Sequence, residues 1–185
     1  MLKERMFGES QAMIVMLVWL TVMVIGNLVG GAIGDALFSK MSSGRAIVGA
    51  LDVFLSALAL YVTLIWPIED ILGFTILGAI ASFILPMAGP NVSAAVTDVT
   101  EPEVRSSADS LLRIFEFAGS SASPLIAGYL ADLYGLGLGI LYVSVSTWVV
   151  CGILFIILAL VIPKDILETR NRIRIRAELL KKTTG

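Results

Sequence analysis

Apolar residues in this chain are gathered into long blocks, with short polar stretches between them. Five blocks cover residues 12–37, 46–66, 71–96, 107–133 and 138–162. A helix needs about 20 mostly apolar residues to cross the roughly 30 Å hydrocarbon core of a bilayer, and each block is long enough. The pattern therefore predicts an all-α fold, a polytopic transmembrane bundle with five spans.

Composition supports a membrane protein over a soluble one. The chain is 57% apolar and 15% charged, whereas soluble domains carry roughly 25% charged residues. It contains no histidine and one cysteine, Cys151, so an imidazole metal site, a histidine-dependent hydrolase and an internal disulfide are excluded. No phosphate-binding loop is present. We expect no enzyme activity, metal or cofactor and no nucleic-acid partner.

The distribution of Lys and Arg predicts the orientation. The N-terminal segment and the second and fourth connections together carry two basic residues, whereas the other side of the membrane carries ten. Basic residues concentrate on the cytoplasmic side. We therefore expect an extracytoplasmic segment over residues 1–11, a transmembrane domain over 12–162, and a basic cytoplasmic tail over 163–185, in a multi-pass protein of the cell (plasma) membrane.

The start of the chain conflicts with this orientation. Lys3 and Arg5 precede the first block, and such a span ordinarily inserts with its N-terminus inside. We therefore expect at least one further helix before Met1, in a fragment or a half-protein that needs a partner chain. The alternative is that two charges are too few to orient the span.

Small residues recur every four positions in two blocks. The stripes are Gly26, Gly30 and Gly34 in the first block, and Gly119, Ser123, Ala127 and Ala131 in the fourth. Lipid provides little hydrophobic drive for helix association, so small residues favour close packing. We expect both helices in the bundle interior, the fourth sheltered from lipid.

Prolines interrupt two blocks, at Pro86 and Pro90 in the third and at Pro124 in the fourth. Each proline removes an amide donor and frees the carbonyl four residues earlier. Breaks or kinks are therefore expected there. Transporters use broken helices to line a pathway, although static bundles contain them too.

Polar residues within the blocks are candidates for function, because a charge at the bilayer centre costs at least about 2.5 kcal/mol. Asp109, Arg113 and Glu116 share one face of the fourth helix, with Glu116 about 14 Å into the span at 1.5 Å per residue. In a transport pathway, Arg113 would hold an anionic group of the solute, and Glu116 would balance the charge of Arg113 or carry a proton. An equal alternative is that these charged residues form a structural ion pair that locks the bundle. Asn27 is a further candidate, and Asp52 is expected to be structural.

Two connections contain a recognisable signature. The first reads Gly31-Ala-Ile-Gly34-Asp35 and, after a turn, ends in Gly44-Arg45; the second reads Asp98-Val-Thr-Glu101-Pro102-Glu103-Val-Arg105. The following block ends with Pro124, Gly128 and Asp132 at spacings of four. These patterns resemble the loop signature and helix end of the major facilitator superfamily. Ala36 and Ala46 stand where that family often has basic residues.

The resemblance implies a partial fold of this family, with the five spans as helices 8 to 12 of a twelve-helix transporter. It implies that Asp35 caps a neighbouring helix, that Arg45 pairs with Asp98, and that these contacts bias the bundle between two states. The switch loop would include Gly31, Gly44 and Arg105. Ordinary anchoring on the cytoplasmic side is an alternative role for Lys40 and Arg45.

The expected function is alternating-access transport of a small solute by an incomplete C-terminal part of a secondary active transporter. Its expected partners are the lipid bilayer, a small-molecule substrate and a missing N-terminal half or partner chain. The alternative is a non-transporting scaffold or truncated pseudo-transporter. The residues after 163 have two readings. They form either a basic tail that lies on the anionic inner leaflet or an orientation anchor with a frayed end, and we favour the anchor.

Overall fold

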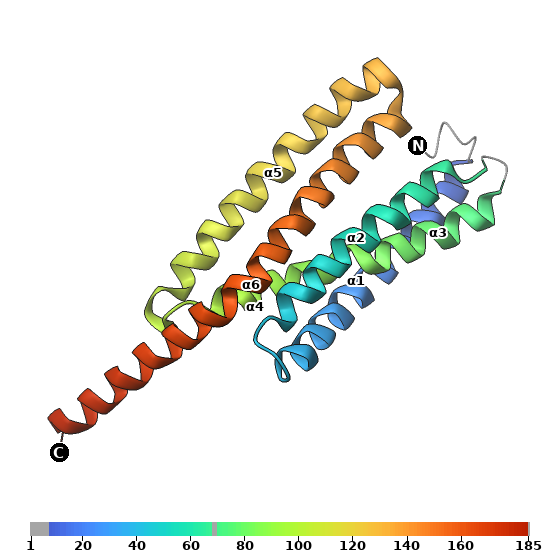
Figure 1. The fold of residues 1–185 in the computed structure, drawn as a ribbon. Coiled ribbons are helices and arrows are strands. Elements are labelled where there is room, and N and C mark those ends of the chain that lie inside the picture. The colour runs from blue at the N-terminus through green and yellow to red at the C-terminus, as the bar shows by residue number, and fades with distance from the viewer. Residues whose placement is uncertain (1–7, 68–69, 185) are drawn as a thin grey trace.

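The computed structural model describes residues 8–67 and 70–184, and Figure 1 shows how its helices are arranged. In chain order the elements are α1 Glu9–Phe38, α2 Gly44–Ile65, α3 Ile71–Ile84, the 3-10 turn η1 Leu85–Met87, α4 Ala88–Asp98, the 3-10 turn η2 Pro102–Val104, α5 Arg105–Tyr134 and α6 Leu136–Thr184. The described residues contain no strand, so the predicted all-α bundle is confirmed. The expectations for Lys3 and Arg5 lie outside the described residues.

Four helical stretches in the described part of the chain are long and apolar enough to cross a membrane. They are α1, α2, the continuous run Ile71–Asp98 through α3 and α4, and Leu136–Lys182 of α6. The 30-residue helix α5 is about 45 Å long at 1.5 Å per residue. The helix α5 is therefore long enough to cross a membrane. Its charged residues and serines, rather than its length, keep it out of this group.

The glycine stripe of α1 packs on the α3–α4 run as predicted. Gly26, Gly30 and Gly34 are buried on α1, and a side chain at any of them would overlap its neighbour. The pairs in contact are Gly26 with the Phe83 backbone, Gly30 with Met87, and Gly34 with the Asn91 side chain. The missing side chains let the two helices approach closely.

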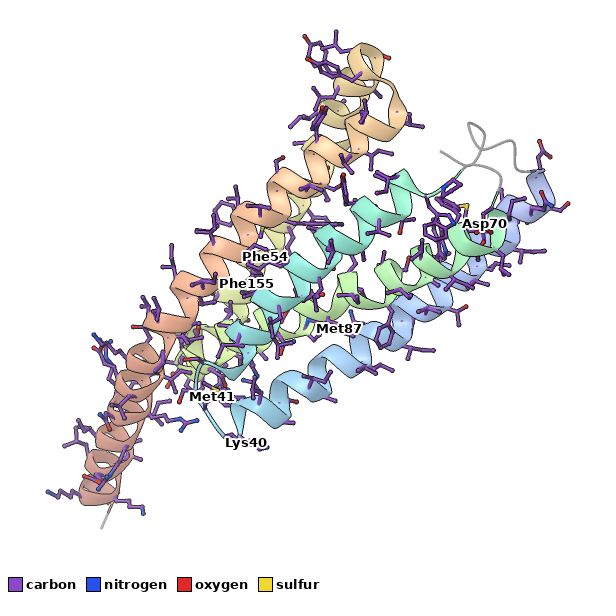
Figure 2. The ribbon with its side chains drawn as sticks, turned by 45° about the vertical axis from the view of Figure 1, so that its right-hand side comes forward. Lys40, Met41, Phe54, Asp70, Met87 and Phe155 are labelled. Carbon is purple, nitrogen blue, oxygen red and sulfur yellow. The ribbon has the colours of Figure 1, made fainter. Side chains whose placement is uncertain are left out.

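Glycines also shape the contact between α2 and α6. Phe155 of α6 lies over Gly49 of α2, and Phe54 of α2 lies over Gly152 of α6. Figure 2 labels the two phenylalanines at the contact between these helices. Each ring fills the space left by a glycine on the opposite helix, which holds α6 along α2.

Prolines act differently in the third span and in α6. The third span changes to a 3-10 turn at η1, which contains Pro86, and continues as α4. In contrast, α6 continues through Pro163. Proline at this position frees the Ala159 carbonyl, and the Ser43 hydroxyl donates to that carbonyl at 2.7 Å. The hydrogen bond that the proline removes is thus replaced from the connection between α1 and α2.

The expected interior position of the fourth helix is wrong for the described chain. No residue of α5 is buried, and α5 packs on α6 and, more weakly, on α4. Ala127 and Ala131 contact α6 at Gly139, but nothing lies within 4 Å of a side chain built at Gly119. The helix lies at the edge of the bundle because one flank alone has helical neighbours.

The basic segment after residue 163 is a continuation of α6 rather than a frayed end. It projects beyond the other helices as a straight extension (Figure 1). The Thr169 hydroxyl donates to the Val99 carbonyl at 3.1 Å, and Arg176 pairs with Glu101 and Glu103 at 3.3 and 2.9 Å. These contacts fix the segment against the connection that follows α4.

Candidate functional site

A charged cluster joins three helices at one end of the bundle. Arg45, at the start of α2, lies 2.7 Å from Asp35 of α1 and also pairs with Asp98 at the end of α4. The Arg45 guanidinium lies 4.1 Å from the centre of the Phe38 ring, close enough for a cation–π contact. We call these four residues the loop cluster.

Local backbone geometry places the loop cluster. The chain turns sharply after α1, and a side chain at Gly44 would meet the Leu37 backbone at 2.5 Å, so glycine there allows Arg45 to reach back to α1. Asp35 pairs with Arg45, and within the described ranges the structure assigns no capping hydrogen bond to the Asp35 side chain. Gly31 faces Pro90. The Arg105 side chain lies apart from the cluster, and its Nε donates to the Thr100 carbonyl at 3.3 Å.

A second cluster lies on α5 and reaches α4. Arg113 pairs with Glu116 at 2.8 Å and with Asp109 at 3.6 Å, and its Nη2 donates to the Ser93 hydroxyl at 3.2 Å. All three charged side chains are about half exposed. We call these four residues the α5 cluster. One guanidinium serves two carboxylates, so the cluster carries a net negative charge.

The 11-residue helix α4 carries a member of each cluster. Ser93 contacts Arg113, and Asp98 contacts Arg45. Asn91 is 2% exposed, and its amide donates to the Gly30 and Met87 carbonyls at 3.0 and 2.8 Å. A short helix that follows the 3-10 turn η1 therefore connects α1, α2 and α5.

The structure does not bring Asn27 to Arg113. Asn27 is exposed on α1, whose packing partners are α2, α3, η1 and α4, whereas α5 packs on α4, η2 and α6. The two side chains therefore lie on helices that do not pack together.

Two buried polar residues were not predicted as functional. Asn91 has no sequence signal beyond its place after Pro90, yet it lies against Gly34 and ties α4 to α1. Asp52 of α2 is 3% exposed, and the Ser56 hydroxyl lies 3.5 Å from its Oδ1. Its Oδ2 is buried and has no hydrogen-bond partner among the described residues, and its structural role stays a prediction.

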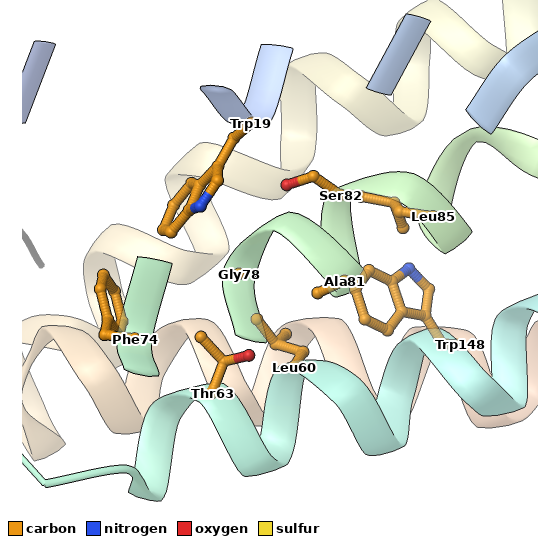
Figure 3. A pocket seen from close by; sticks show the side chains of 9 residues that line it. All are labelled: Trp19, Leu60, Thr63, Phe74, Gly78, Ala81, Ser82, Leu85 and Trp148. Carbon is orange, nitrogen blue, oxygen red and sulfur yellow. The ribbon is translucent and has the colours of Figure 1, made fainter. Parts of the chain in front are cut away.

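An apolar hollow of about 110 Å³ lies between α1, α2, α3 and α6 (Figure 3). Trp19, Phe74 and Trp148 provide its aromatic walls, and the Trp19 indole donates to the Thr75 carbonyl at 3.0 Å. None of the charged residues of the two clusters lines this hollow. Its lining suits an apolar group and offers no counter-charge to an ion.

The comparison with protein families agrees with the architecture and with the loop signature. No curated protein and no solved structure matches the chain significantly. The model of the Major Facilitator Superfamily matches residues 1–182. Together with the four stretches of the described residues that are long and apolar enough to span a membrane, this match shows a multi-pass membrane protein of the transporter class. The chain belongs to the Major Facilitator Superfamily.

Proposed function

We propose that this chain is the C-terminal part, helices 8 to 12, of a secondary active transporter that moves a small solute by alternating access. The observation that carries the proposal is the position of α4, which touches both charged clusters. Alternating access requires that events at a site within the membrane change contacts at the membrane surface. A short helix that contacts both charged clusters provides that connection.

The α5 cluster is the proposed solute and coupling site. Its side chains are half exposed within the chain, on a helix that the family match places in a membrane protein. Charged side chains on a membrane-spanning helix face a polar cavity or a partner helix. Arg113 can bind an anionic group of the solute, and Glu116, released from Arg113, can carry a proton.

The loop cluster is the proposed switch. Arg45 holds α1, α2 and α4 together when it pairs with Asp35 and Asp98. Movement of α4 away from α2 separates Asp98 from Arg45. The pairs therefore stabilise the closed arrangement of this end, which we infer to be cytoplasmic from the concentration of basic residues.

A second candidate is a non-transporting scaffold that needs a partner chain. It is favoured by the internal pairing of Arg113 with two carboxylates, which already balances the arginine without a ligand. In that case the α5 cluster locks helices together and binds no solute.

Solute exchange separates the two candidates. Proteoliposomes that contain the complete gene product are loaded with a panel of small anionic, zwitterionic and neutral solutes, and uptake of the labelled solute is measured. A transporter exchanges at least one solute faster than protein-free liposomes. A scaffold exchanges none, although it still folds and inserts.

A further inference from the structure

A polar hollow of about 290 Å³ lies between the α1–α2 connection and α6, and it shares Phe38 with the loop cluster. Its lining residues are Phe38, Ser39, Lys40, Met41, Ser42 and Arg170. Figure 2 labels Lys40 and Met41 in the connection, close to where α6 leaves the bundle. Lys40 and Arg170 come from distant parts of the sequence, so this site depends on the fold.

Apolar packing brings the two basic residues together. Ile162 and Ile166 of α6 are each 2% exposed and pack with Ala95, and Phe38 adjoins this core. Arg170 follows Ile166 by four residues, so it lies on the same face of α6, one turn further along. The core that fixes Phe38 against α6 thus fixes Arg170 beside the connection that carries Lys40.

Among the described residues, no carboxylate pairs with the two basic side chains of the hollow, Lys40 and Arg170. Its lining contains no carboxylate, and the structure assigns no ion pair to Lys40 or Arg170 in the described residues. Five carboxylates of α1, α4, α6 and the connection after α4 pair with other arginines. These pairs are Asp35 and Asp98 with Arg45, Glu101 and Glu103 with Arg176, and Glu168 with Arg172. Asp165 of α6 lines a separate hollow, with Ala95 and Ile162.

We propose that this hollow binds a phosphate group, presented by the headgroup of an anionic membrane lipid. A guanidinium and an ammonium are the usual phosphate-binding cations in proteins, and the hydroxyls of Ser39 and Ser42 provide further donors. Basic residues immediately beyond a membrane span attract anionic lipids. The bound phosphate would bridge the connection and α6, and so stabilise the attachment of the terminal half of α6.

Lipid-dependent thermal stability tests the proposal. The full chain is placed in phosphatidylcholine nanodiscs, with and without phosphatidylglycerol, and its unfolding temperature is measured. A parallel arm adds inorganic phosphate to the phosphatidylcholine discs. The variant is Lys40→Gln with Arg170→Gln. The matched control is Lys181→Gln with Lys182→Gln, which removes the same charge from the exposed end of α6.

Phosphatidylglycerol should raise the unfolding temperature of the wild type and the control, and the double variant should lose this rise. An increase with inorganic phosphate alone would support the phosphate site but overturn lipid as its source. Equal responses in all three proteins, or equal losses in the variant and the control, would overturn the site. If the double variant does not fold, each single variant should show a reduced rise in its place.

Discussion

At the scale of single residues, glycine positions determine how closely the helices approach. A side chain at Gly26 would overlap the Phe83 backbone, whereas a side chain at Gly119 meets nothing within 4 Å. Small residues recur every four positions in both helices, so the sequence pattern predicts close packing equally for both. Only the fold shows that all three glycines of the α1 stripe meet a neighbouring helix, whereas Gly119 of the α5 stripe meets none in the described residues.

Substitution of these two glycines should have opposite effects. Gly26→Ala should lower the free energy of unfolding by about 1–3 kcal/mol, because backbone atoms of α3 must move to admit the methyl group. Gly119→Ala should be neutral or slightly stabilising, since alanine is the better helix former. Thermal unfolding in detergent measures both; equal destabilisation would contradict the packing described for α1.

Asp70 stabilises the start of α3 in a pH-dependent way. Its carboxylate accepts hydrogen bonds from the Gly73 amide at 2.8 Å and the Trp66 indole at 2.9 Å. These donors, the Gly73 amide first, lower the pKa of Asp70 below its ordinary value. Because the folded state favours the ionised form, this stabilisation is present above the ordinary pKa and is lost as pH falls through the lowered one.

We therefore expect Asp70→Ala to lower the unfolding temperature at neutral pH, with the difference from wild type shrinking in acid. Asp70→Asn should also cap the helix but should not titrate, so its contribution should not decline in acid. Unfolding temperatures measured across the acid range would test this. A wild-type advantage over Asp70→Ala that grew as pH fell would contradict the assignment.

At the scale of helices, a proline has the effect that its surroundings allow. Breaks or kinks were predicted at Pro86 and Pro90 in the third span and at Pro124 in the fourth. The 3-10 turn η1 contains Pro86, whereas α5 continues through Pro124. The continuation of α6 through Pro163 was not predicted, because the compensating donor, Ser43, lies 116 residues away in sequence. Local sequence identifies the freed carbonyl but not the side chain that satisfies it.

The Ser43 hydrogen bond has a specific test. Ser43→Ala should lower the free energy of unfolding by about 1–3 kcal/mol, because the Ala159 carbonyl loses its donor. Pro163→Ala restores a backbone donor four residues after Ala159. In a protein that already carries Pro163→Ala, Ser43→Ala should therefore lower the free energy of unfolding much less. A double-mutant cycle by thermal unfolding measures the coupling, and additive effects would show that the two residues act independently.

The loop cluster should hold three helices together. Asp98→Ala removes one partner of Arg45 and should speed backbone hydrogen exchange over residues 37–47, where α1 turns into α2. Arg105→Ala is the control, since Arg105 bonds the Thr100 carbonyl and lies outside the cluster. Hydrogen-exchange mass spectrometry should show faster exchange for Asp98→Ala alone. Equal exchange in both variants would remove the proposed role of Asp98.

At the scale of the whole molecule, the sequence predicts the type of fold better than it predicts which helices are neighbours. The length of the apolar blocks is enough to predict helices of membrane length, and the loop signature is enough to indicate the family that the comparison shows. The placement of α5 at the edge, and the separation of Asn27 from Arg113, depend on which helices are neighbours. Hydropathy along one chain does not contain that information.

The central claim is that the α5 cluster handles a transported solute, and solute flux tests it most directly. Arg113→Ala and Glu116→Gln are compared with wild type in proteoliposomes of the complete gene product, using a solute that the wild type exchanges. Arg174→Ala is the control, because it removes a similar exposed pair, with Glu178, beyond the apolar part of α6. The account predicts loss of most flux in the two α5 variants and wild-type flux in the control; wild-type flux in both α5 variants would contradict it.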